Sequence, residues 1–68
     1  MKCIVNENSE ILFTGDRNEM QLAYEYLTES SYKLAKTRGL KMADIYELNA
    51  KYWKGKAKEA KAFYLADA

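Results

Sequence analysis

The sequence contains no histidine, a single cysteine (Cys3) and three glycines that lie far apart. Without histidine there is no Ser-His-Asp triad and no histidine-ligated metal site. One cysteine forms neither an internal disulfide nor a cysteine–histidine zinc set. Gly15, Gly39 and Gly55 are isolated, so they do not form a phosphate-cradling loop. We therefore expect a protein that is not an enzyme and that has no cofactor and no bound metal.

Long apolar runs are also missing. No stretch approaches the roughly 20 apolar residues of a membrane-spanning helix, and no apolar run follows Lys2 to form a secretory signal. The unpaired Cys3 suits a reducing compartment, and a buried, unreactive thiol is the expected role for it. These features predict a soluble cytoplasmic protein with no membrane partner.

The short length of the chain limits how much surface it buries on folding. At 68 residues, with 49% apolar and 31% charged residues, the chain has the composition of one small globular domain, residues 1–68. A chain of this size buries only about 60% of its unfolded surface. Small domains without disulfides or metals depend on regular helix packing or on oligomerisation. A homodimer is therefore expected.

Charge is distributed unevenly, although the net charge is only +1. Residues 1–30 hold six acidic residues against two basic ones, whereas residues 31–68 hold nine basic residues against four acidic ones. Such asymmetry marks a nucleic-acid surface in some proteins and an acidic helix packed beside a basic one in others. We favour the second origin.

The first fifth of the chain predicts a β-hairpin with strands at about 2–6 and 10–14. Residues 3–5 and 11–13 are β-prone runs on either side of a turn-forming stretch. A type I turn with Ser9 in the left-handed conformation pairs Asn6 with Glu10 and Val5 with Ile11. A two-residue loop at Asn8-Ser9 is the alternative, and we prefer the first register. It predicts two faces: Cys3, Val5, Ile11 and Phe13 on one, and Ile4 and Leu12 on the other.

A helix is predicted over about 16–37. Asp16 is its expected N-cap, Ser30-Ser31 is the point where it bends or stops, and Gly39 favours the left-handed conformation that ends helices. Its apolar stripe comprises Met20, Ala23, Tyr24, Leu27, Ser31, Leu34 and Ala35.

A second helix is predicted over about 41–66, antiparallel to the first. One side carries the apolar residues Met42, Ile45, Tyr46, Trp53, Ala57, Ala60, Phe63 and Tyr64, with Tyr52 at the edge. Gly55 interrupts it at a cost of about 1 kcal/mol relative to alanine, which favours a kink rather than a break. The expected fold class is therefore α+β with the order ββαα.

Tyrosine and tryptophan point to a function in binding. Six tyrosines and one tryptophan are many for this length, and both residue types are enriched where interfaces bind most tightly. A helix of this length spans about 37 Å and a five-residue strand about 17 Å, so part of the helix stays uncovered. The predicted partner-binding residues are Tyr26, Tyr32, Tyr52, Trp53, Phe63 and Tyr64.

Lysines on the opposite side of the second helix support an alternative function. Lys51, Lys54, Lys58 and Lys61 form a row that suits phosphate contacts, which predicts a small nucleic-acid-binding protein. The same row also fits a solvated helix face. Arginine is scarce, and its fork is preferred for base and phosphate recognition, so protein binding is our first hypothesis. An antitoxin-like or assembly subunit is a third option.

Residues 4–15, followed by a capped helix, resemble the hairpin-then-helix opening of many small phage and mobile-element proteins. Anti-CRISPR and anti-restriction inhibitors are among these proteins. The resemblance covers about residues 3–30 and carries no diagnostic functional residue. It implies a non-catalytic inhibitor whose protein partner belongs to a host or its defence machinery.

Overall fold

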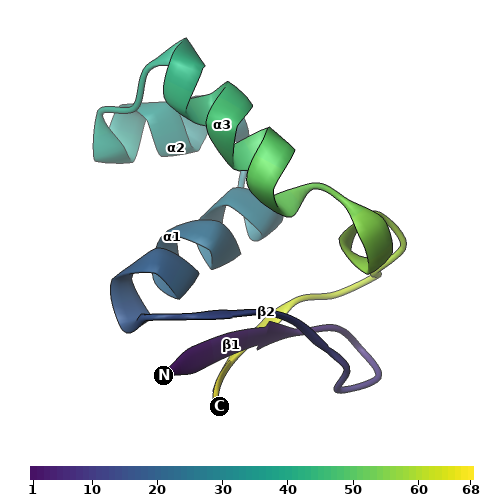
Figure 1. Ribbon diagram of the computed structural model, residues 1–68. Helices are drawn as coiled ribbons and strands as arrows, with labels where there is room; N and C mark the ends of the chain where they lie inside the picture. The colour runs from purple at the N-terminus through teal and green to yellow at the C-terminus, as the bar shows by residue number, and fades with distance from the viewer.

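The computed structural model describes residues 1–68 and consists of a three-stranded antiparallel sheet with three α-helices on one side of it (Figure 1). Its elements are β1 (Lys2–Val5), β2 (Ile11–Gly15), α1 (Arg17–Thr28), α2 (Ser31–Arg38), α3 (Met42–Tyr52), the 3-10 turn η1 (Gly55–Lys58) and β3 (Tyr64–Asp67). The predicted α+β class is confirmed. The order ββαα is incomplete, because the chain has a third helix and a third strand.

The hairpin turn forms as predicted. Ser9 has a positive φ of 61°, and the Asn6 amide donates to the Glu10 carbonyl at 3.1 Å. The buried Asn6 side chain accepts from the backbone amides of Asn8 and Glu10, at 2.9 and 3.0 Å. An asparagine that bonds the backbone two residues on stabilises a turn of this kind. The predicted pairing of Val5 with Ile11 is confirmed.

The predicted hairpin faces are wrong for Phe13, because a β-bulge follows the Val5–Ile11 pair. Cys3, Val5 and Ile11 share one face, and Ile4 lies on the other, as predicted. Ile4 pairs with Phe13, and Leu12 is left as the extra residue of β2. A bulge shifts the register by one residue, so Ile4 and Phe13 share a face instead of lying on opposite ones. Leu12 and Phe13 both pack against the core.

The predicted helix 16–37 is two helices. Asp16 is the N-cap of α1, as predicted, and accepts from the Glu19 amide at 2.8 Å. The helix ends at Thr28, and Ser30 caps α2 by accepting from the Lys33 amide at 3.1 Å. A serine oxygen that satisfies a free amide favours the start of a new helix over continuation of the old one. The break therefore lies at the predicted weak point.

An ion pair fixes α2 against α1. The guanidinium of Arg38 donates two hydrogen bonds of 2.7 Å to the Glu25 carboxylate. The bidentate Arg38 contact lowers the pKa of Glu25 to about 2. Gly39 follows with a φ of 66°, which confirms the predicted left-handed end of this helix.

The predicted helix 41–66 is wrong beyond Tyr52. Gly55 has a φ of 57°, which a right-handed helix excludes, and the chain turns through η1 toward the sheet. Residues 64–67 then form β3, which pairs with β1 on the side opposite β2, with Leu65 facing Ile4. The amide of Ala68 donates to the Met1 carbonyl at 3.1 Å, so the two termini lie side by side (Figure 1).

The core lies between the sheet and the helices. Its buried residues are Ile4, Met20, Ala23, Leu34, Leu48 and Tyr52. Phe13 and Tyr52 meet edge to face, with ring centroids 5.1 Å apart, so the end of α3 is packed on the sheet. Because the helix is shorter than predicted, its inward residues are Ile45, Leu48 and Tyr52, while Met42 and Tyr46 face outward.

We expect Gly55→Ala to lower the free energy of unfolding by about 1 kcal/mol, because a Cβ disfavours the left-handed conformation. No atom lies within 4 Å of the added Cβ, so the backbone conformation alone decides whether the substitution stabilises or destabilises the protein. In a continuous helix the same change would stabilise the protein by about 1 kcal/mol. Urea denaturation measures the difference. Gly39→Ala, also left-handed and in open space, is the positive control, and a stabilised Gly55→Ala protein would contradict the turn.

Candidate protein-binding surface

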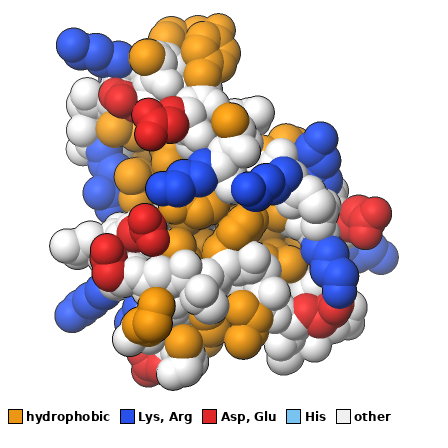
Figure 2. All heavy atoms as spheres, viewed as in Figure 1, with side chains coloured by type: hydrophobic (Ala, Val, Ile, Leu, Met, Phe, Trp, Pro, Cys, Tyr) orange, Lys and Arg blue, Asp and Glu red, His pale blue; other side chains and the backbone are white.

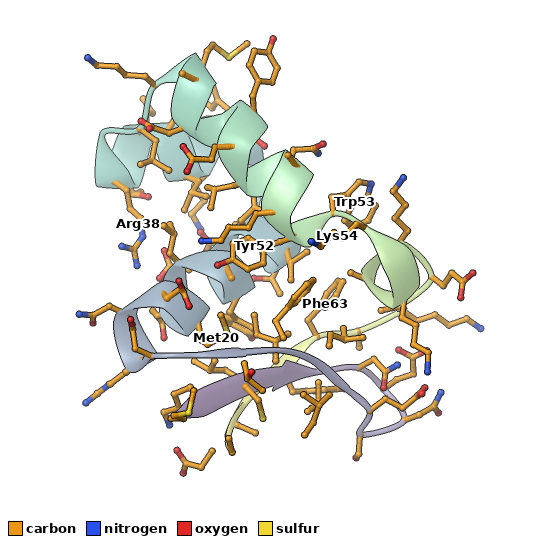
Figure 3. The ribbon with its side chains drawn as sticks, in the orientation of Figure 1. Met20, Arg38, Tyr52, Trp53, Lys54 and Phe63 are labelled. Atoms are coloured by element: carbon orange, nitrogen blue, oxygen red, sulfur yellow. The ribbon has the colours of Figure 1, made fainter.

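The six predicted partner-binding residues do not form one surface. Tyr52 is only 4% exposed, and Phe63 is half-buried and packs on the core. Figure 3 shows both between α3 and the sheet, with Trp53 outside them. Tyr26 is half-buried, and its hydroxyl accepts a hydrogen bond of 2.7 Å from the Asn49 amide group. Tyr52 therefore belongs to the interior of the monomer.

The three exposed members of the set lie apart. Tyr32 is on α2, Trp53 follows the last residue of α3, and Tyr64 begins β3. In Figure 1, α2 is far above the sheet that contains β3. A single contact surface therefore includes Tyr64 or Tyr32, but not both.

Tyr64 belongs to an open sheet face, which we define as Cys3, Val5, Ile11, Thr14, Tyr64 and Ala66. Directly opposed residues of an antiparallel pair share a face, and successive residues alternate. Ile4 is fully buried under the helices, and its half-buried strand partners Phe13 and Leu65 pack against the same core. The residues next to Ile4, and the residues opposed to them, therefore lie on the side that no helix covers (Figure 1).

Apart from Thr14, this open sheet face is apolar, and it carries no charged residue. Its central row runs across all three strands, from Ile11 through Val5 to Tyr64. Ile11 is 61% exposed and Tyr64 is 55% exposed, while Val5 between them is half-buried. Exposed apolar residues that adjoin in a row mark an interaction surface more reliably than single ones.

Cys3 lies in the next row, between Thr14 and Ala66. It is a free cysteine and is buried, as predicted, with 3% of its surface exposed. The ammonium of the preceding Lys2 pairs with the Asp67 carboxylate at 2.7 Å and holds the pKa of that carboxyl below its usual value. This contact joins the first residue of β1 to the last residue of β3.

The predicted lysine row is not a helix face, because α3 ends at Tyr52. Lys51 is on α3, Lys58 is in η1, and Lys54 and Lys61 lie in the connecting segments. Lys51 pairs with Glu19 at 3.6 Å, and its ammonium lies 5.6 Å from the Tyr52 ring. Burial raises the pKa of Tyr52. None of the five ion pairs includes Lys54, Lys58 or Lys61.

The sequence interpretation missed Val5 and Ile11 as surface residues because the bulge and β3 were not foreseen. One available signal was the run Phe63-Tyr64-Leu65, which is β-prone. No group of three or more Cys, Asp or Glu side chains is placed to hold a metal ion. No helix has both the length and the apolar character needed to cross a membrane.

No protein-family model, curated protein or solved structure matches this chain.

Proposed function

We propose that this chain is a non-catalytic protein-binding module whose open sheet face docks onto an apolar surface of another protein. The observation that carries the proposal is the row Ile11–Val5–Tyr64, which crosses an uncovered sheet and is exposed at both ends. An antiparallel sheet with one apolar face uncovered leaves hydrophobic area in water that a partner would bury.

The chemistry of the face favours protein over nucleic acid. None of its six residues is charged, so it offers no cation to phosphate and no partner to a buried charge. Tyr64 combines an apolar ring with a hydroxyl that remains able to hydrogen-bond at the edge of a contact, as interface tyrosines do. The resemblance of residues 3–30 to small phage proteins supports a host or defence protein as the partner.

Nucleic acid binding through the lysines has less support. A phosphate-binding row needs several free cations along one surface. Lys51 is already paired with Glu19, and the other three lysines belong to differently directed segments. The alternative is supported by three lysines that are exposed and take part in no ion pair: Lys54, Lys58 and Lys61.

Photo-crosslinking from position 64 tests the docking face. Benzoylphenylalanine in place of Tyr64 is expected to form a covalent bond to one partner protein in a host lysate. The captured partner, once purified, is expected to bind Tyr64→Lys more than tenfold more weakly than the unsubstituted chain. The physical reason is that lysine removes an aromatic anchor and places a charge in an apolar contact.

Tyr32→Lys is the matched control, because it makes the same change at a tyrosine that is 74% exposed on the distant helix α2. It is expected to bind the partner normally, and circular dichroism checks that both variants fold. Equal binding by Tyr64→Lys and the unsubstituted chain would overturn the proposal. Crosslinking at position 64 to a second copy alone would also overturn it.

A further inference from the structure

A second apolar surface lies on the face turned toward the viewer in Figure 2, where orange side chains sit in a depression crossed by lysines. It contains two adjoining hollows. The first has a volume of about 210 Å³ and lies between α1 and α3. It is lined by Leu22, Leu40, Leu48 and Tyr52, and by the charged residues Glu19, Asp44, Glu47 and Lys51. Three carboxylates against one lysine make this hollow acidic.

The second hollow, of about 380 Å³, lies between β2 and the turn that leads into η1. It is lined by Ile11, Leu12, Phe13, Ala57 and Gly55, and by Lys54 and Lys56. Both of its charged residues are basic. The two volumes are at or below the small end of the range for drug-sized ligand sites, so a protein surface is the better fit.

The two hollows meet at the edge-to-face contact of Phe13 with Tyr52. Tyr52 lines the acidic hollow, Phe13 lines the basic one, and their ring centroids are 5.1 Å apart. Figure 3 shows Tyr52 beside Lys54 at this junction. We call the two hollows and this junction the two-hollow face. It is one apolar surface with an acidic end and a basic end.

One charge at each end has no partner within the chain. Lys51 pairs with Glu19, Lys56 with Glu10, and the Asp44 carboxylate accepts from the Lys41 amide. Glu47 and Lys54 make no hydrogen bond or ion pair through their side chains, and both are exposed. Each end of the two-hollow face therefore offers a free charge of opposite sign.

We infer that the two-hollow face is occupied by a second copy of this chain in a two-fold symmetric dimer. In such a dimer the same patch meets itself, so residue i of one copy contacts residue j of the other, and the reverse. A face with an acidic end and a basic end meets this condition, because a two-fold axis that passes midway between Glu47 and Lys54 sets Glu47 of each copy opposite Lys54 of the other.

The size of the chain favours the same conclusion. Only 10 of 68 residues are buried in the monomer, and the accessible surface is 4689 Å². A standard interface buries about 800 Å² on each partner, which is roughly a sixth of this surface. Small domains without disulfides or metals gain stability in this way. Ile11 belongs to both surfaces, but Glu47 and Lys54 lie outside the open sheet face, so substituting them tests the dimer separately from the proposed function.

A charge-swap experiment tests the dimer. Sedimentation equilibrium at low salt is expected to give a dimer mass for the unsubstituted chain. Lys54→Glu and Glu47→Lys are each expected to weaken dimerisation at least tenfold, because each places two like-charge pairs in the symmetric interface. An equimolar mixture of the two variants is expected to restore the dimer, since both cross-contacts then join opposite charges.

Lys36→Glu, on α2 and outside both hollows, is the control and is expected to leave the dimer unchanged. All three substitutions change exposed side chains, and circular dichroism verifies that each variant folds. A monomer mass for the unsubstituted chain up to about 1 mM would overturn the inference. So would a mixture that stays monomeric, or a dimer that both single variants form as well as the unsubstituted chain does. None of these results bears on the Tyr64 crosslinking outcome.

Discussion

Tyr52→Ala is expected to lower the free energy of unfolding by about 3–5 kcal/mol, the usual cost of removing a buried aromatic ring. Tyr52 is 4% exposed, joins the core cluster and meets the Phe13 ring edge to face. It is the last residue of α3 and the point at which this helix is packed on β2. The substitution therefore removes a contact between two layers of the fold as well as a core side chain.

Urea denaturation followed by circular dichroism measures the loss. Tyr46→Ala is the matched control, because Tyr46 lies on the same helix but is 66% exposed, and its loss is expected to cost less than about 1 kcal/mol. A domain of this length has a total stability of only about 3–10 kcal/mol, so Tyr52→Ala is expected to populate the unfolded state. Tyr52→Leu then gives a measurable intermediate loss. Equal costs at positions 46 and 52 would contradict the placement of Tyr52.

Local signals in the sequence predicted the structure correctly wherever a few neighbouring residues decide the backbone conformation. The hairpin turn depends on the Asn6 side chain and on Ser9, and both act within four residues. The N-cap of α1 and the left-handed end of α2 are similarly set by Asp16 and Gly39. These positions were predicted correctly because no distant contact competes with them.

The predicted helix over residues 41–66 failed because a distant partner outweighs local propensity. Residues 54–62 are rich in lysine and alanine, which are strong helix formers. The chain nevertheless leaves the helix after Tyr52. This allows β3 to pair with the edge of β1 that β2 leaves free, with Leu65 opposite Ile4. The pairing of β3 with β1 joins the two ends of the chain. The hydrophobic periodicity of a local segment does not reveal such a distant pairing.

The candidate surface was predicted only in part for the same reason. Tyr64 was chosen as a contact residue, but as the end of a helix rather than as the first residue of a strand. The pairing of β3 with β1 made Val5 its neighbour, and the bulge at Leu12 moved Phe13 off the face that Val5 shares with Ile11. Both features are properties of the assembled sheet.

Ile4→Ala is expected to lower the free energy of unfolding by about 2–5 kcal/mol, because it leaves a cavity in the middle of the core. Ile4 is fully buried on the central strand, with Phe13 and Leu65 opposed to it and the helices above it. In the predicted hairpin register without the bulge, Ile4 shares its face with Leu12 instead of Phe13. Val5→Ala is the matched control, since Val5 is next in sequence, lies on the open sheet face and is half-buried. We expect it to cost about 1 kcal/mol or less. Urea denaturation of the two variants compares the two faces directly. A larger loss for Val5→Ala than for Ile4→Ala would contradict the placement of Ile4 under the helices.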